Sequence, residues 1–329
     1  MDEIVEHVKT FDITLWKNEE NKFLKKLIRT FETNNIRAFE DISINFLNWN
    51  NQINNTKIVI ISTDNPNSDS WYQDLYLTCE THNLHATIIS SNVLTKTIES
   101  DNVKYIFLKE LYGVYYNPNI RTNIKEYKNL YTCLMQRTNY PRLKLFLDLK
   151  KNNLLQRGNV SLLGFNYDNK TANSVLREIL DKHDIELDFE LDLPFKNFED
   201  KDSTYKVEQQ SKYNIVCESY NDNAYPECIG FSEKTFRSLQ IPNITLMLNK
   251  KGSINILSDL GFKTHKINCL LDSLTDYNCQ NDFIISALEN DYCEANEVVE
   301  FAEHNALILK KYNERINSDV FINEIVKNI

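Results

Sequence analysis

Glycine and proline are both scarce in this sequence, with six of each among 329 residues. Neither G-x-G-x-x-G nor G-x-x-x-x-G-K-[ST] occurs, so the chain lacks both the dinucleotide-binding fingerprint and the P-loop. Both patterns need glycines because the backbone must approach a phosphate closely. The sequence therefore gives no support to a P-loop kinase or to an NAD-dependent dehydrogenase.

The cysteines and the apolar runs of the sequence exclude further classes of protein. The seven cysteines are scattered, odd in number and include no C-x-x-C pair, so neither a cysteine-bound metal nor a disulfide framework is expected. No stretch approaches the ~20 apolar residues of a membrane span, and no secretory signal opens the sequence. We expect no membrane span and a cytoplasmic location, which would be the host cytoplasm if the source is viral.

The formal net charge of −10 argues against wholesale wrapping of nucleic acid, because polyanion binding needs clustered cations. The charge is uneven, however. Residues 121–157 hold nine Lys/Arg and two Asp/Glu, a local balance of 9 − 2 = +7. This basic segment could concentrate positive potential on a small anion such as a diphosphate, or it could be a solvated helix face.

The length predicts two α/β domains, because single cores rarely grow beyond ~250–300 residues. In the first part, strands and helices alternate in the manner of right-handed βαβ units and a parallel sheet. The expected helices are 15–34 and 68–83, and the expected strands are 57–62, 85–90 and 103–108. A polar stretch near 115–128 marks the expected boundary.

A second α/β set is expected beyond that boundary. Its predicted strands are 130–136, 160–165, 213–217 and 244–248, and its predicted helices are 141–155, 171–182, 232–240 and 253–260, with mostly helical sequence over 282–329. Asn139 is a suitable N-cap for the first of these helices. We thus expect an N-terminal domain over 1–125, a C-terminal domain over 126–285, and helices over 286–329 that pack back on the N-terminal domain.

The most informative stretch is 213–266. A buried strand ends at Cys217, which places Glu218 at the carboxyl edge of a sheet, where open α/β sheets bind ligands. Ser232 is a good N-cap for the next helix, whose first N–H groups favour an anion. Lys234 lies in that first turn, where a cation opposes the helix dipole unless an anion compensates. This conflict favours phosphate binding, although Lys234 could also be a surface lysine and Glu218 a loop carboxylate.

The pattern IVCES … FSEKTFRSL … LGFKT (215–264) resembles the C-terminal domain of α-1,3-fucosyltransferase-like enzymes and of phage and bacterial glycosyltransferases. The segment QRTNYPRLKLFLDLKKNNLLQRGNVS (136–161) is similar to the arginine-containing stretch of the same group. The likeness covers residues 130–266. The resemblance implies a GT-B architecture, with two Rossmann-like domains and the donor nucleotide-sugar on the second.

The resemblance also implies roles for individual residues. Lys234 would contact the diphosphate, Glu218 a ribose or sugar hydroxyl, and Glu233 the donor sugar or base. Candidate donor-binding residues are Arg137, Arg142, Glu218, Ser232, Glu233, Lys234 and Thr235. Arg237, one turn beyond Glu233, is expected to pair with that acid. The turn 241–243 departs from the fucosyltransferase pattern, so the donor base and sugar stay open.

We therefore expect a glycosyltransferase that needs no metal or other cofactor and uses a nucleotide-sugar as substrate. Asp64 and Glu110, each following a predicted strand, are candidate general bases. The pair Asp200 and Asp202 lies in a hydrophilic loop, and we expect no metal site there. The acceptor could be a glycan or phage-type modified DNA. A non-catalytic nucleotide-sugar-binding module is the alternative, and it would bind the donor without transfer.

Overall fold

The computed structural model describes part of the chain. The described residues are 37–40, 57–62, 69–94, 101–120, 126–135, 139–162, 165–166, 171–172, 174–183, 201–218, 228–274, 276–291 and 297–328. They divide between two compact units. Unit 1 draws on Met1–Tyr116, Ala224–Gly230 and Leu309–Ile329, and unit 2 on Asn117–Asn223 and Phe231–Ile308.

Unit 1 contains a four-stranded parallel sheet in the order β1-β2-β3-β5. Its elements are β1 (Arg37–Glu40), β2 (Lys57–Ser62), α4 (Asp69–His82), β3 (His85–Ser90), β4 (Val93–Leu94), β5 (Val103–Phe107) and the 3-10 helix η2 (Lys109–Tyr115). The expected strands at 57–62, 85–90 and 103–108 are confirmed. The helix expected over 15–34 lies outside the described residues. The short strand β11 (Cys228–Ile229) pairs antiparallel with β4.

Sequence from the C-terminal part of the chain completes the core of unit 1. The expected helical stretch is confirmed as α11 (Tyr277–Asn290), α12 (Val298–Ile316) and α13 (Asp319–Lys327). Apolar side chains at the end of α12 and in α13 pack against the end of β3 and the start of η2. The cluster comprises Ile89, Leu108, Leu111, Ile316, Phe321, Ile322 and Ile325. Gly113 approaches α12 so closely that a Cβ there would lie 2.3 Å from the backbone nitrogen of Asn313.

Unit 2 contains the second four-stranded parallel sheet, in the order β12-β10-β6-β7. Its main elements are β6 (Asn129–Met135), α5 (Tyr140–Lys151), β7 (Gly158–Leu162), α6 (Ser174–Lys182), α7 (Lys201–Gln209), β10 (Ser211–Cys217), α8 (Glu233–Leu239), β12 (Ile244–Leu248), α9 (Ser253–Asp259) and α10 (Ile267–Ser273). A small antiparallel pair, β8 (Phe165–Asn166) and β9 (Thr171–Ala172), lies outside this sheet.

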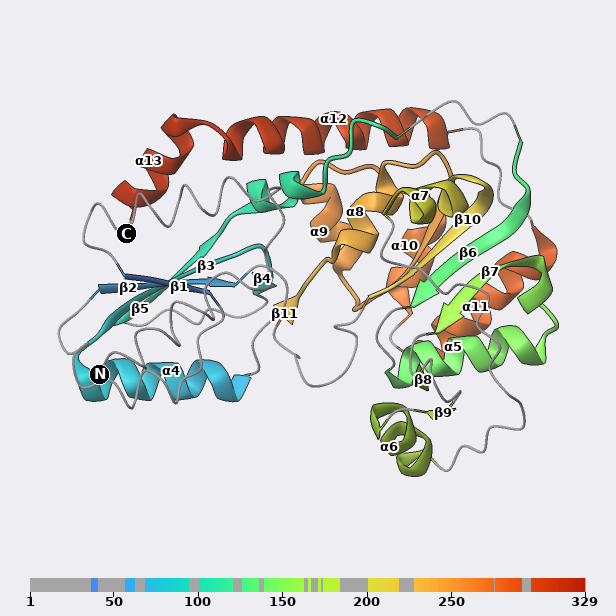
Figure 1. The fold of residues 1–329 in the computed structure, drawn as a ribbon, viewed down its shortest axis with the longest axis horizontal. Helices are drawn as coiled ribbons and strands as arrows, with labels where there is room; N and C mark the ends of the chain where they lie inside the picture. The colour runs from blue at the N-terminus through green and yellow to red at the C-terminus, as the bar shows by residue number, and fades with distance from the viewer. Residues whose placement is uncertain are drawn as a thin grey trace. The chain divides into compact units, whose positions relative to one another are not determined.

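Helices cover both faces of this second sheet (Figure 1). On one face, α5, α10 and α11 pack on apolar residues that are in register across the strands, such as Cys133, Ile215 and Leu246. On the other face lie α7 and α8. That face is polar, because Thr132, Asn214 and Thr245 form a buried row in register. The first face is therefore the hydrophobic core of unit 2.

Several element bounds differ from the expected ones. The strand expected over 160–165 is β7 at Gly158–Leu162, and β10 begins at Ser211 rather than at 213. The helix α5 ends at Lys151 rather than at 155, because Asn153 adopts the left-handed backbone conformation (φ 56°). Thr171 and Ala172, expected to begin a helix, form β9 instead, and α6 begins at Ser174. The N-caps Asn139 and Ser232 are confirmed, since each side chain accepts a hydrogen bond from a first-turn backbone N–H.

Candidate functional site

In the sheet of unit 2, the connections that leave neighbouring strands run in opposite directions at one position. From β6 the chain passes to β7 on one side, and the later strand β10 lies on the other side of β6. In open α/β sheets this switch point, at the carboxyl ends of the strands, is where ligands bind. Arg142 in the first turn of α5 and Glu218 directly after β10 both belong to this edge. The candidate site is built there.

Glu218 is fully buried, and its two carboxylate oxygens have different environments. Oε1 accepts a hydrogen bond from the backbone N–H of Ser232 at 3.0 Å and another from the hydroxyl of Thr235. These contacts fix the start of α8 against the end of β10. Oε2 is buried and has no hydrogen-bond partner within the described part of the chain. Such a group is costly to bury unless something else satisfies it.

Arg142 is also fully buried. Its Nε–H donates to the backbone carbonyl of Cys217 at 3.0 Å, and its Nη2 donates to the same oxygen. The guanidinium therefore holds the end of β10 next to the start of α5. Sequence reasoning had proposed Arg142 only as a phosphate ligand, and this tertiary contact could not be read from local sequence.

The charges of this edge converge on one thiol. Burial raises the pKa of Cys217 to about 11, and the charges of Arg142, Glu218 and Lys234 all act on it. Arg142 and Lys234 lower that pKa, whereas Glu218 raises it. Two cations and one carboxylate predicted separately from sequence are thus brought together around the end of β10.

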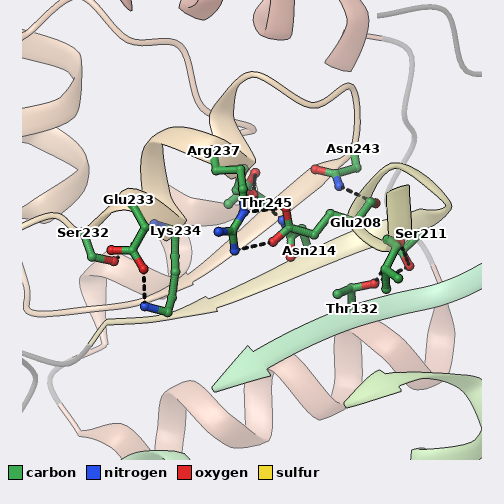
Figure 2. A network of polar contacts seen from close by, with 12 residues as sticks. Thr132, Glu208, Ser211, Asn214, Ser232, Glu233, Lys234, Arg237, Asn243 and Thr245 are labelled. Atoms are coloured by element: carbon green, nitrogen blue, oxygen red, sulfur yellow. Dashed lines mark hydrogen bonds and ion pairs between the residues drawn. The ribbon is translucent and has the colours of Figure 1, made fainter. Parts of the chain in front are cut away.

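Lys234 has a carboxylate partner within its own helix. Its ammonium lies 2.7 Å from Oε1 of Glu233, and the lysine side chain is only 11% exposed against 45% for the glutamate (Figure 2). Burial raises the pKa of Glu233, but the Lys234 ammonium, together with the charge of Arg237 and a backbone hydrogen bond, brings it below its ordinary value. The anion that the helix dipole demands is therefore supplied by Glu233, so dipole conflict alone does not call for a phosphate.

Arg237 does not pair with Glu233 as expected. Its guanidinium makes two 2.7 Å contacts with the carboxylate oxygens of Glu208 from α7 (Figure 2). Sequence reasoning missed this partner because Glu208 lies 29 residues away and on another helix. The ion pair joins α7 to α8 over the polar face of the sheet.

A chain of neutral hydrogen bonds completes that polar face. The hydroxyl of Ser238 lies 2.8 Å from both Asn214 Nδ2 and Thr245 Oγ1, and Thr132 bonds Ser211 at 2.5 Å. Figure 2 labels four of these side chains, Thr132, Ser211, Asn214 and Thr245. The network fixes α8, and with it Ser232 to Thr235, relative to β10 and β12.

The basic segment 121–157 does not form one patch in its described part. Lys144 pairs with Asp148 at 2.5 Å, and Lys150 and Lys151 occupy the last turn of α5. Arg157 immediately precedes β7 and so lies at the amino end of the sheet, opposite the candidate site. Arg142 lies at the carboxyl edge. Arg137 lies outside the described residues.

The two candidate bases belong to unit 1. Asp64 lies outside the described residues. Glu110 is the second residue of η2, is 6% exposed, and has one oxygen 3.4 Å from the guanidinium of Arg315. Arg315 in turn lies 3.4 Å from Glu324 of α13. Glu110 is therefore held by the C-terminal helices of its own unit.

Over the described ranges, no group of three or more His, Cys, Asp or Glu side chains is placed to hold a metal ion. None of the described helices is long and apolar enough to span a membrane. The chain matches no protein-family model, no curated protein and no solved structure. The likeness to fucosyltransferase-like enzymes therefore stays a hypothesis carried by residues 130–266 alone.

Proposed function

We propose that the protein is a glycosyltransferase whose unit 2 binds a nucleotide-sugar donor at the carboxyl edge of the sheet. The observation that carries this proposal is the partner-free, buried Oε2 of Glu218 beside the switch point. A carboxylate at the end of a parallel strand is a natural acceptor for a ribose or sugar hydroxyl. Arg142 and Lys234, which act on the same edge, would supply positive charge near a diphosphate.

The chemistry needs that charge. Glycosyl transfer passes through an oxocarbenium-like state while the nucleotide diphosphate leaves with growing negative charge. Fixed cations in a site of low dielectric stabilise such charge strongly. In this proposal the Lys234 ammonium leaves Glu233 and contacts the diphosphate. Arg142 and Arg137 supply further positive charge to the same diphosphate. Ser232 and Thr235 position the start of α8, and Glu233 lies near the sugar or base.

The proposed architecture is GT-B, with unit 2 as the donor-binding Rossmann-like domain and unit 1 as the acceptor side. Asp64 or Glu110 of unit 1 would deprotonate the acceptor hydroxyl. The acceptor is proposed to be a glycan or phage-type modified DNA. We propose that transfer needs no metal, so EDTA should leave it largely intact; a complete loss that Mg²⁺ or Mn²⁺ restores would contradict this.

A non-catalytic nucleotide-sugar-binding module is the second candidate. It is favoured by the ion pairs that engage Glu110 with Arg315 and Lys234 with Glu233. Both candidates would bind the donor, and they differ in whether the sugar is then transferred. A module would bind the donor, neither hydrolyse nor transfer it, and bind it equally well after Glu110→Gln or Asp64→Asn.

The test is a thermal-shift panel of UDP-, GDP-, CMP- and dTDP-sugars against the wild type and Lys234→Ala. A ligand that binds only the native state adds about 2.7 kcal/mol of stability at a hundredfold excess over Kd. We expect one nucleotide class to stabilise the wild type and to have a much smaller effect on the variant. Lys263→Ala is the matched control, since Lys263 also pairs with a glutamate, at 2.6 Å. No shift with any donor in folded wild type would overturn the proposal.

A further inference from the structure

Asn249 is a second buried residue at the carboxyl edge with an unsatisfied polar atom. It directly follows β12 and is 4% exposed. Its Oδ1 accepts the backbone N–H of Lys250 at 2.7 Å, and its backbone carbonyl accepts Nε2 of Gln280 at 3.3 Å. Its Nδ2 has no hydrogen-bond partner in the described part of the chain. The side chain is thus oriented by one atom and leaves a donor unused.

Asn249 and Glu218 occupy equivalent positions on neighbouring strands. Cys217 pairs with Leu248, and the N–H of Glu218 donates to the carbonyl of Leu248 at 3.2 Å, so the ladder continues past the strand ends. Parallel strands are about 4.8 Å apart. Cys217 and Leu248 belong to the apolar core face. Glu218 lies on the opposite face, where it contacts Ser232 and Thr235 at the start of α8. We infer the same facing for Asn249 from the alternation of side chains along β12.

The two partner-free atoms are chemically complementary. Oε2 of an ionised Glu218 can only accept a hydrogen bond, and Nδ2 of Asn249 can only donate one. A phosphate would accept from Asn249 but would be repelled by Glu218. A vicinal diol fits both, because one hydroxyl can donate to the carboxylate while its neighbour accepts from the amide. Two unsatisfied buried groups in adjacent positions are costly without such a ligand.

We propose that Asn249 and Glu218 together bind the 2′,3′-diol of the donor's ribose. This inference rests on the proposed function, because it assumes that a nucleotide occupies the edge. It makes Asn249 a specificity-determining residue, which sequence reasoning had not selected. It also predicts that ribonucleotide donors bind more tightly than dTDP-sugars, which lack the 2′-hydroxyl.

Asn249→Asp is the sharpest variant. It keeps the oxygen that accepts from Lys250 and replaces the free N–H donor with a second acceptor. Asn243→Asp is its matched control. Asn243 lies just before the same strand, at the amino end, is 6% exposed, and donates its Nδ2 to the carbonyl of Glu208 at 3.2 Å. Both substitutions remove one amide donor next to β12, but only one removes it at the proposed site.

The measurement is titration calorimetry with UDP, GDP and CDP and with their 2′-deoxy and 3′-deoxy forms. We expect the wild type to bind the preferred ribonucleotide roughly 3- to 10-fold more tightly than at least one deoxy form, the scale of one hydrogen bond. Asn249→Asp should weaken binding of the ribonucleotide by at least that factor. The variant should also no longer distinguish the ribonucleotide from the deoxy form that lacks the hydroxyl contacted by Asn249. Asn243→Asp should retain this discrimination.

The outcomes separate the two proposals. Equal wild-type affinity for ribo and deoxy forms would overturn the diol assignment while leaving donor binding intact. Full discrimination in Asn249→Asp would overturn the role of Asn249 alone. If folded wild type binds none of these nucleotides, both this inference and the proposed function fail.

Discussion

The guanidinium of Arg142 donates two hydrogen bonds to the backbone carbonyl of Cys217, from the first turn of α5 to the last residue of β10. This contact spans the switch point of the sheet, since β6 leads into α5 and β10 is the neighbouring strand. It ties the start of α5 to the end of β10, directly before Glu218. Stability and the proposed donor binding would therefore both depend on Arg142.

Arg142→Met should lower the free energy of unfolding by about 1–3 kcal/mol, because it removes both donors to a buried carbonyl. Urea denaturation monitored by circular dichroism measures the change. Arg157→Met is the control: Arg157 is exposed, so its replacement should change stability by less than about 0.5 kcal/mol. Equal effects of the two substitutions would contradict the structural role assigned to Arg142.

The Glu208–Arg237 pair should behave as a buried ion pair, since the two side chains are 3% and 16% exposed. Glu208→Gln or Arg237→Met alone should cost about 3–5 kcal/mol, because each leaves an uncompensated charge. The double variant should cost less than the sum of the two. A double-mutant cycle in urea measures this coupling, and strict additivity would show that the two side chains do not interact.

The Glu233–Lys234 pair should make stability depend on pH. The folded-state pKa of Glu233 is lowered, so its contribution is present at neutral pH and is lost as the pH falls through that pKa. The glutamate is 45% exposed, so we expect about 1 kcal/mol or less. The difference in unfolding free energy between wild type and Glu233→Gln should therefore shrink between pH 7 and pH 3. A constant or growing difference would show that the Glu233–Lys234 pair does not contribute to the pH dependence of stability.

Cysteine alkylation should follow burial and pKa. At pH 8, iodoacetamide should modify Cys269 and Cys279, which are exposed, before Cys217. Burial raises the pKa of Cys217 to about 11, so its reactive thiolate is scarce at that pH. Peptide mass spectrometry over time gives the order, with a denatured sample as the control in which all three react. Early modification of Cys217 in folded protein would show that the edge is open.

Local signals were sufficient for much of unit 2. Asn139 and Ser232 were predicted as N-caps because a cap needs only its own residue and the turn that follows it. Glu218 was predicted at a strand end because the apolar run before it has a clear boundary. The partners of Arg142 and Arg237 were not predictable, since each is fixed by the packing of elements distant in sequence. Asn249 was missed for a related reason: its unpaired donor is visible only when all neighbours are known.

In unit 1, even more of the structure depends on contacts that local sequence does not reveal. Its strands were predicted from short apolar runs, but its core depends on side chains from α12 and α13. Nothing in the sequence around Gly113 indicates that this glycine must lie against the backbone of Asn313. Glu110 follows a strand as expected, yet its contact with Arg315 depends on the same long-range packing.

The division of unit 1 along the chain has a consequence for biosynthesis. Gly113 and Asn313, whose contact lies in this unit, are 200 residues apart, and all of unit 2 lies between them in the sequence. Because chains emerge from the ribosome from the N-terminus and domains fold as units, the sheet of unit 2 can be complete while unit 1 still lacks Phe321, Ile322 and Ile325. Early strands of unit 1 must then wait, with apolar surface uncovered, for the last helices to be made. Chaperone dependence during translation should accordingly fall on the first third of the chain rather than on unit 2.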